Sequence, residues 1–511
     1  MRRCVVVAHI GELLASRTEQ WPDKIFLIAE REGRTFTYRE FHRRVTQTAH
    51  FLHRLGVDKG DIVSLWLPNC TEFVLFYFAC WTLGAIAGPI NAHLKGPEAR
   101  YILNHSEARF LVTQADYWPT VESIRRDVNV ERVILTDAHV DGAIDYRSEV
   151  ERLSPVIPST TINPDDEAII IYTSGTTGRP KGVLLTHRNL MVNARQIADW
   201  LHFTPEDRFL CIMPLFHMNA VAVTTLTPLT VGASIVLSPK FSVRRHWSLI
   251  AEYGVTTFGS VATMLSMLLN AYPAGIPEGL DTRRLKFALC GSAPVPVPVM
   301  EEFENRFNCP VIEGYGLSEC TCRATFNPPD ERRRLGSVGL PIGNEMKIFD
   351  DEDRELPPGE IGEIVLRGEN VMKGYFKNPE ATRRAFRHGW FHTGDLGYRD
   401  EDGFFYVVDR KSDMIIRGGE NIYPREIDEV LYQHPAVREA ATVGVPDELY
   451  GEAVKAFVVL KEGVDCRPEE LMAFCRARLA DYKCPTLIEF IDEIPKGPTG
   501  KLLKRELLNR S

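Results

Sequence analysis

Apolar and polar positions alternate between strand-like and helix-like spacing over most of the chain. Residues 36–38 read as a short strand, and residues 39–55 follow with the spacing of an amphipathic helix. Further strands, separated by helical patterns, are predicted at residues 61–67, 108–113, 132–135, 209–213, 234–237 and 287–289. This strand–helix–strand alternation predicts an α/β fold with layered, largely parallel and buried sheets.

One apolar stretch, residues 73–90, is about as long as a membrane span. Gly84, Gly88 and Pro89 interrupt it, and Thr71-Glu72 precede it in the manner of a helix start. We therefore predict a buried helix that runs into a buried strand, and no transmembrane segment.

The pattern changes after about residue 336, where turns rich in glycine and proline separate short strands. These strands are predicted at residues 346–349, 363–366 and 404–408. A highly charged segment follows, and beyond it lie two helices and two strands, predicted at residues 424–433, 439–445, 453–460 and 468–479. We predict a domain boundary near residue 409, which divides the chain into domains of residues 1–408 and 409–511.

Composition narrows the class of protein. The 511 residues are 44% hydrophobic and 25% charged, as in ordinary globular proteins. With 60 basic and 69 acidic side chains the formal charge is −9, which disfavours a nucleic-acid partner. The N-terminal apolar run is too short for a signal peptide, and the 11 cysteines include no C-x-x-C pair. We expect a cytoplasmic protein with reduced thiols, whose oligomeric state stays open, a homodimer included.

The strongest chemical signal is a ten-residue segment, Thr173-Ser174-Gly175-Thr176-Thr177-Gly178-Arg179-Pro180-Lys181-Gly182. It follows an apolar run at residues 167–172 that suits a buried strand. Its glycines and hydroxyls supply flexible backbone and donors, and Lys181 adds a cation, so it could surround a polyphosphate. The Walker spacing is missing, and residues 183–185 look like another strand. A flexible hairpin without a ligand is the alternative.

This segment resembles the phosphate-binding signature of the adenylate-forming enzymes, among them acyl-CoA synthetases, firefly-luciferase-like proteins and peptide-synthetase adenylation domains. Four more motifs occur in that family's order, namely Gly314-Tyr315-Gly316-Leu317-Ser318-Glu319, Thr393-Gly394-Asp395, Asp409-Arg410 through Glu420-Asn421, and Pro498-Thr499-Gly500-Lys501. The chain as a whole is similar to acyl-CoA synthetases of the fatty-acid and carnitine/crotonobetaine types. The resemblance implies a large, multi-sheet, AMP-binding N-terminal domain and a small, mobile α+β C-terminal domain with a catalytic lysine.

The implied reaction joins a carboxylic acid to CoA in two steps, through acyl-AMP. A carboxylate is a poor acyl donor, and transfer of AMP from ATP turns its oxygen into a phosphate-ester leaving group. This chemistry needs charge neutralisation and in-line positioning more than a nucleophilic side chain. The resemblance implies ATP, CoA and the acid as partners and Mg²⁺ as cofactor. It implies cofactor-binding roles for Thr173, Ser174, Gly175, Thr176, Thr177, Gly178, Lys181, Ser292, Ala293, Pro294, Gly314, Tyr315, Gly316, Asp395, Arg410, Gly418 and Gly419.

Three residues are candidates for the chemical step. Glu319 is a hard oxygen ligand suited to Mg²⁺, and the matching family residue holds that metal; a solvated helix-start residue is the alternative. Lys501 matches the lysine that bridges carboxylate and α-phosphate, and a flexible ammonium suits a charge that must arrive and later leave. His217 matches an aromatic position that gates the carboxylate pocket in relatives. A buried, hydrogen-bonded histidine is the competing interpretation.

The nucleotide residues also make chemical sense one by one. Tyr315 stands between two glycines, so its ring can lie against adenine, as in the family, although a lone tyrosine is often core. Asp395 can accept from both ribose hydroxyls, and Arg410 resembles the arginine that contacts ribose and phosphate. A turn aspartate and a surface arginine are the alternatives.

The second step implies a rotation of the small domain that withdraws Lys501 and presents Gly418 and Gly419 to CoA. Ser412 aligns with the family's hinge residue, where Asp or Lys is usual, so this chain departs from the pattern there. Free CoA is the expected acceptor because no carrier domain follows Ser511. The alternatives are transfer to a separate carrier protein, a luciferase-like oxygenase and a nucleotide-binding regulatory module.

The acid itself is expected to be aliphatic. The segments that correspond to the family's acyl pocket are residues 218–223, 258–262 and 320–324, and they are mostly apolar or small. A carnitine- or crotonobetaine-type acid is the alternative. Its quaternary ammonium would want an aromatic cage or a carboxylate, whereas these segments supply Phe258 and the cation Arg323.

Overall fold

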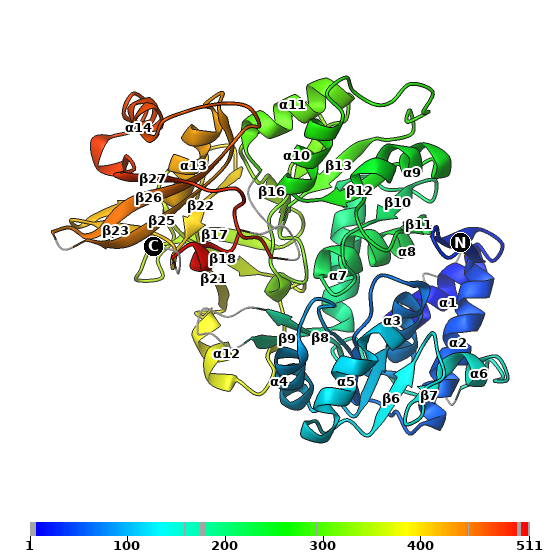
Figure 1. Ribbon diagram of the computed structural model, residues 1–511. Helices are drawn as coiled ribbons and strands as arrows, with labels where there is room; N and C mark the ends of the chain where they lie inside the picture. Colours follow the sequence, from blue (N-terminus) through cyan, green and yellow to red (C-terminus); the bar gives the residue numbers. More distant parts are fainter. Residues whose placement is uncertain are drawn as a thin grey trace.

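The computed structural model describes residues 7–157, 160–173, 180–291, 295–447, 449–497 and 502–508. A large lobe carries two many-stranded sheets, and a smaller C-terminal lobe packs against one end of it (Figure 1). This arrangement confirms the predicted layered α/β fold with a large N-terminal part and a small C-terminal part.

The first large sheet has seven strands in the order β14-β13-β12-β10-β11-β1-β2. Its strands are β1 (Ile25–Ala29), β2 (Arg34–Thr37), β10 (Arg208–Cys211), β11 (Ser234–Leu237), β12 (Thr257–Ser260), β13 (Phe287–Cys290) and β14 (Val311–Glu313). All neighbours pair in parallel except β1 and β2. The carboxyl ends of β12, β13 and β14 therefore meet at one edge of the sheet.

The second large sheet has eight strands in the order β19-β9-β8-β4-β3-β5-β6-β7. Its strands are β3 (Ile62–Leu65), β4 (Ile86–Pro89), β5 (Phe110–Thr113), β6 (Arg132–Leu135), β7 (Ile144–Asp145), β8 (Glu167–Thr173), β9 (Lys181–Thr186) and β19 (Gly374–Tyr375). Strand β9 returns antiparallel along β8, so that Thr173 is the register partner of Lys181. The two ends of the glycine- and threonine-rich segment are thereby held side by side.

Helices cover the faces of both sheets. Those of the large lobe are α1 (Ile10–Gln20), α2 (Tyr38–Arg54), α3 (Thr71–Leu83), α4 (Gly96–Ser106), α5 (Trp118–Ile124), α6 (Tyr146–Val150), α7 (His187–Trp200), α8 (Thr227–Val231), α9 (His246–Tyr253), α10 (Ala262–Ala271) and α11 (Val297–Phe307). Helix α2 begins at a capping box in which the Thr37 hydroxyl and the Glu40 carboxylate each accept from the other residue's backbone N–H. A π-helical segment, Asn219–Leu226, leads into α8.

Helix α3 is buried almost all around, which explains its uninterrupted apolar sequence. It ends at Gly84, whose φ of 73° is a left-handed conformation, and β4 follows. The predicted buried helix and strand are confirmed. Within the described part of the chain, no helix is both long enough and apolar enough to cross a membrane.

Shorter strands link the two lobes. A third sheet consists of β17 (Glu345–Phe349), β18 (Gly362–Arg367), β20 (Phe386–Arg387), β21 (Trp390–Arg399) and β22 (Phe405–Arg410), with α12 (Pro379–Ala385) between β19 and β20. Strands β15 (Thr325–Phe326) and β16 (Leu340–Pro341) form a two-stranded ladder. Strand β21 carries Asp395 and pairs with β22, which carries Arg410.

The C-terminal lobe has a three-stranded sheet and a separate hairpin. Its elements are β23 (Ile415–Arg417), β24 (Glu420–Ile422), α13 (Pro424–Tyr432), β25 (Val437–Asp447), β26 (Gly451–Leu460), α14 (Pro468–Arg476), β27 (Leu487–Phe490) and α15 (Lys504–Leu508). Phe405 still packs in the core of the large lobe, whereas Ile415 belongs to a core of the C-terminal lobe. The boundary at residue 409 stays a prediction, and it lies between these two residues.

Candidate active site

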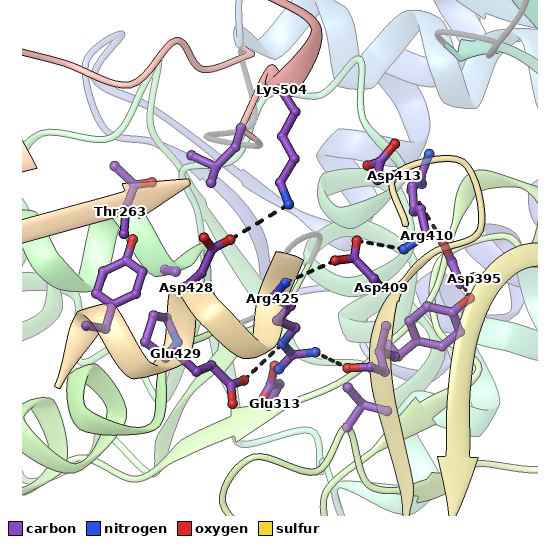
Figure 2. Close-up of a pocket in the computed structure, with 18 of the residues that line it drawn as sticks. Thr263, Glu313, Asp395, Asp409, Arg410, Asp413, Arg425, Asp428, Glu429 and Lys504 are labelled. Carbon is purple, nitrogen blue, oxygen red and sulfur yellow. Dashed lines mark hydrogen bonds and ion pairs between the residues drawn. The ribbon is translucent and has the colours of Figure 1, made fainter. Parts of the chain in front are cut away.

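A cavity of about 250 Å³ opens between the two lobes. Residues of the large lobe line one side of it, and α13 with the strands around it lines the other (Figure 2). The large lobe contributes, among others, Thr263, Pro296, Glu313, Gly314, Tyr315, Gly316, Leu317 and Asp395. The cavity lies at the carboxyl ends of β12–β14, where ligands of open parallel sheets commonly bind.

The wall at residues 314–317 is shaped by the absence of side chains. A Cβ at Gly316 would overlap the carbonyl group of Cys322, and a Cβ at Gly314 would overlap the Phe326 ring and the Thr325 carbonyl. The backbone of this turn therefore packs directly on residues 322–326. Its position directs the Tyr315 side chain toward β21.

Tyr315 is joined to two charged residues of the third sheet. Its hydroxyl donates to Asp395 Oδ2 at 2.5 Å, and its backbone N–H donates to Thr325 Oγ1 at 3.1 Å. Arg410 Nε lies 3.3 Å from the other Asp395 oxygen. Burial raises the pKa of the Tyr315 hydroxyl well above its ordinary value, so the hydroxyl stays a donor. The ring, a carboxylate and a guanidinium thus form one unit on the cavity wall.

A second cluster joins Glu319 to the ends of the glycine- and threonine-rich segment. The Tyr375 hydroxyl donates to Glu319 Oε1 at 3.0 Å, and Lys181 Nζ lies 4.9 Å from the centre of the Tyr375 ring. Burial raises the pKa of the Glu319 carboxyl above its usual range. Tyr375 therefore connects Glu319 with Lys181, the register partner of Thr173.

The C-terminal lobe adds charges of both signs. In Figure 2, Arg425 lies between two acids: its backbone N–H donates to Asp409 Oδ2 at 3.0 Å and its Nε donates to Glu429 Oε1 at 3.0 Å. Lys504 Nζ lies 3.7 Å from Asp428 Oδ2. Lys496 and Leu502 form an antiparallel β-bridge, and both line the cavity. The residues on either side of the Pro498–Lys501 motif therefore meet at the cavity.

Glu313 is the most strongly buried acid in the wall. It is 2% exposed, and the Val295 N–H donates to its Oε1 at 3.3 Å. Burial raises the pKa of Glu313 to about 7, against the opposing effect of Arg425. This carboxyl group is consequently poised to exchange a proton near neutral pH.

The structure brings together only part of the predicted site. Gly314, Tyr315, Gly316, Asp395 and Arg410 line the cavity, whereas Thr173, Lys181 and Glu319 belong to the neighbouring Tyr375 cluster. Several predicted residues lie outside the described residues, namely Ser174, Gly175, Thr176, Thr177, Gly178, Ser292, Ala293, Pro294 and Lys501.

Three predicted residues lie elsewhere in the fold. Gly418 and Gly419 form the turn of the β23–β24 hairpin at the outer edge of the C-terminal lobe, and neither lines the cavity. His217 is also absent from the cavity lining; it is half-buried, and its buried Nε2 has no hydrogen-bond partner among the described residues. Burial lowers the pKa of His217 to about 4, which keeps the ring neutral. Its gating role stays a prediction.

Some residues that line the cavity or contact Glu319 were not predicted from the sequence. Arg425, Asp428 and Glu429 fall on one face of the predicted helix 424–433 at spacings of three and four residues, a signal that could have identified them. Tyr375, in contrast, lies in the two-residue strand β19 and belongs to no recognisable motif. Only the pairing of β19 with β9 brings it to Glu319.

Comparisons with known proteins agree with this geometry. Residues 14–376 match the model of the AMP-binding enzyme family, and residues 426–501 match that of the AMP-binding enzyme C-terminal domain. A sulfoacetate–CoA ligase of Cupriavidus necator is 39% identical over 505 residues, 98% of each chain. A crotonobetaine/carnitine–CoA ligase of Salmonella arizonae is 34% identical over 514 residues, again 98% of each. The solved structure of ATP-bound MatB from Rhodopseudomonas palustris has a TM-score of 0.91 at 30% identity and covers 98% of both chains.

The buried Glu313 generates a prediction about pH. Its folded pKa of about 7 exceeds the ordinary glutamate value, so between the two values the folded state keeps a proton that the unfolded state has lost. Stability then falls with rising pH, by roughly 1.4 kcal/mol per pH unit in that window. Glu313→Gln should melt at nearly the same temperature as the wild type at pH 5 and at a higher temperature at pH 8. A gap in melting temperature that does not change with pH would contradict this.

Proposed function

This chain belongs to the AMP-binding enzyme family, and we propose that the cavity between its lobes carries out a two-step ligase reaction. The protein is an ATP-dependent acid–CoA ligase that works through an acyl-adenylate. In the first step a carboxylate oxygen of the acid bonds to the α-phosphorus of ATP, and pyrophosphate leaves. In the second step the CoA thiol, losing its proton, bonds to the acyl carbon, and AMP leaves.

One observation carries the assignment of the site. Tyr315, Asp395 and Arg410 line the same cavity as Lys496 and Leu502, which flank the Pro498–Lys501 motif. We assign the Tyr315 ring to adenine, Asp395 to the ribose hydroxyls and Arg410 to ribose and phosphate. The hydrogen bond from Tyr315 to Asp395 holds that carboxylate in place, and its second oxygen faces Arg410.

The Tyr375 cluster supports a phosphate and Mg²⁺ site. Desolvation raises the pKa of the Glu319 carboxyl group and so makes its ionisation costly, and a cation beside Glu319 would offset that cost. Within the described chain, no group of three or more His, Cys, Asp or Glu side chains could hold a metal ion. Mg²⁺ does not require one, because it commonly uses one or two carboxylates with phosphate oxygens. Glu319 would bind the ion, and the Lys181 ammonium would bind the phosphates of ATP. Bound Mg²⁺ would neutralise part of the phosphate charge.

Lys501 is assigned to the adenylation step. Its neighbours are anchored at the cavity by the Lys496–Leu502 bridge and by the ion pair of Lys496 with Glu439 at 2.6 Å. An ammonium there would stabilise the negative charge that builds up as carboxylate meets α-phosphate. The arrangement of the lobes fits the first half-reaction, since Lys496 and Leu502, which flank the motif, line the cavity and the Gly418–Gly419 turn does not.

The second half-reaction then requires the C-terminal lobe to move. We assign Ser412 as the pivot, because it stands between Arg410, which is tied to the large lobe, and Ile415, which belongs to the small one. Rotation would replace the Lys501 motif by Gly418 and Gly419 at the cavity and admit CoA. Full-length relatives that are named CoA ligases favour CoA over a carrier protein as acceptor.

The identity of the acid stays a prediction. The aliphatic side chains expected to line its pocket, Met218, Val221, Val223 and Val261, are all buried. Arg323, in the expected pocket segment 320–324, is also buried. Its positive charge disfavours the quaternary ammonium group of a betaine. A linear or modestly branched aliphatic (fatty) acid fits these neighbours, and a cytoplasmic location stays an expectation.

The half-reactions can be separated by Lys501→Ala. Wild-type protein should release pyrophosphate from ATP and a suitable acid without CoA, and form acyl-CoA when CoA is added. Lys501→Ala should lose about 100-fold or more in pyrophosphate release, yet convert preformed acyl-AMP to acyl-CoA at a near-normal rate. Lys461→Ala, an exposed lysine of the same lobe, serves as the control. Equal loss of both steps would refute a role confined to adenylation.

A pivot at Ser412 predicts the reverse result, namely slower thioester formation with normal adenylation. Ser412→Pro fixes φ near −65° and should slow thioester formation about tenfold while leaving pyrophosphate release intact. Ser412→Ala keeps the backbone free and should behave as wild type in both steps. Single-turnover measurements of acyl-AMP and acyl-CoA test this, and normal thioester formation in the proline variant would remove Ser412 as the pivot.

A metal role for Glu319 predicts a change in the Mg²⁺ requirement. Glu319→Gln should need more Mg²⁺ for half-maximal pyrophosphate release and should be slower by about 100-fold at saturation. Glu369→Gln, an exposed carboxylate of the same lobe, is the control. Mg²⁺ titrations that superimpose for wild type and Glu319→Gln would count against the assignment.

A further inference from the structure

Arg323 is buried without a partner for its charge. The residue is 1% exposed, and its Nε and Nη2 have no hydrogen-bond partner among the described residues. Its backbone, in contrast, is tightly held: Asn193 Oδ1 accepts from its N–H at 3.1 Å, and its carbonyl accepts from Asn193 Nδ2 at 2.7 Å. The side chain lies over the Phe326 ring, with Cζ 5.3 Å from the ring centre. Hydrogen bonds thus fix the backbone of Arg323, whereas Nε and Nη2 of its guanidinium are left without partners.

A buried charge without a partner is destabilising, and proteins normally pair such a group or place it on a ligand. The nearby acid Glu313 does not fulfil this role. Residues alternate between faces along a strand, so Glu313 points to the opposite face of the sheet from Gly314, where the Val295 N–H meets it. Arg323 lowers the pKa of Glu313, but this is the smallest of the effects on that carboxyl group and its pKa stays raised, so the attraction between the two groups is weak. Nε and Nη2 of the guanidinium therefore have no hydrogen-bond partner, and only a weak counter-charge, among the described residues.

Glycines leave space beside Arg323 and beside Asn219 at the sheet edge. A Cβ at Gly291 would come within 2.8 Å of Arg323 Nη2, and Gly314 stands beside Gly291 because Cys290 pairs with Glu313. On β12, a Cβ at Gly259 would come within 2.9 Å of Asn219 Oδ1. Gly259 pairs with Leu289, two residues before Gly291, so all three glycines open toward the same face.

A second unpartnered polar group lies on that face. Asn219 is 5% exposed, and neither its Oδ1 nor its Nδ2 has a hydrogen-bond partner among the residues described. It comes from the π-helical segment, whereas Arg323 comes from the loop after the 3₁₀ turn that carries Glu319. Two separate parts of the chain thus direct unpaired donors to the carboxyl ends of β12 and β13.

We propose that Arg323, assisted by Asn219, binds a second anionic group, a carboxylate or sulfonate, on the acid that this ligase activates. Nε and Nη2 form one edge of the guanidinium, and this fork matches two oxygens of such a group. The inference rests on the proposed ligase function and narrows its substrate to a doubly anionic acid. Arg323 is then a specificity-determining residue rather than a participant in phosphoryl transfer.

The position also limits the length of the acid. Gly314 lines the nucleotide cavity, and Gly291, against which the guanidinium lies, is its neighbour across the sheet at one strand spacing, about 4.8 Å. An acid whose two anionic groups are one or two carbons apart spans that distance. Longer chains would have to displace the Arg323 side chain from its buried position.

Matched acids test the proposal on the wild-type protein. Pyrophosphate release should be compared for malonate against malonamate and for sulfoacetate against methylsulfonylacetate, since each pair differs mainly in the second charge. We expect kcat/KM to favour at least one dianion by about 100-fold over its neutral-ended partner. The pair with the larger ratio identifies carboxylate or sulfonate as the bound group.

Variants of Arg323 test whether this residue causes the preference for the dianionic acid. Arg323→Met should abolish the preference for the dianion and leave rates with the neutral-ended acids within a few fold, whereas Arg323→Lys should keep part of the preference. Arg188→Met, which removes a surface arginine paired with Asp165, should keep all of it. The wild-type comparison stands even where a variant folds poorly.

Thermal melting gives a readout independent of turnover. Without acid, Arg323→Met should melt at a higher temperature than wild type, because an unpaired buried charge is removed. The preferred dianion should raise the melting temperature of the wild type and not that of Arg323→Met, with sodium acetate at equal ionic strength as control.

The outcomes separate the two proposals. Pyrophosphate release that is equal or faster with neutral-ended acids, and unchanged in Arg323→Met, would overturn the second-anion site and leave the ligase function standing. Absence of pyrophosphate release with every acid would overturn the proposed mechanism. In that case the melting experiment alone decides about the anion site. A rise in the melting temperature with the dianion that is absent in Arg323→Met supports the site, and no rise in the wild type refutes it.

Discussion

The direct packing of the Gly314–Gly316 backbone on residues 322–326 is the contact on which the rest of the site depends. No Cβ fits at either glycine, so the turn and the loop behind it must approach as bare backbone. On one side this places Tyr315 against Asp395, where the nucleotide is proposed to bind. On the other side it places Arg323 against Gly291. One close contact therefore positions the groups assigned to both ATP and acid.

The second lobe completes the cavity through charge rather than through apolar packing. Arg425, Lys496 and Lys504 line it, and each forms an ion pair within the C-terminal lobe, with Glu429, Glu439 and Asp428 respectively. Because these pairs do not cross the cavity, the lobe would keep them during the rotation that we propose for the second half-reaction.

Arg323 and Glu313 lower the free energy of unfolding, and we interpret this loss of stability as a requirement of function. Both are buried and incompletely paired, and the protein would be more stable with neutral residues at either position. Natural proteins tolerate such groups mostly where a ligand or a proton is to be bound. Their placement on opposite faces of the same sheet edge gives the site one group for a proton near neutral pH and one for an anion.

The sequence by itself determined the fold class, the main helices and strands, and the motifs of the nucleotide site, because periodicity and short motifs are local properties. The short strands β12 and β14 were not predicted, because β12 contains a glycine and a serine that weaken its strand pattern and β14 has only three residues. The tertiary structure alone decided that Tyr375 meets Glu319 and that Nε and Nη2 of the buried Arg323 have no hydrogen-bond partner. These facts depend on which distant segments come together and on what burial does to a charge, and neither is written in the spacing of residues along the chain.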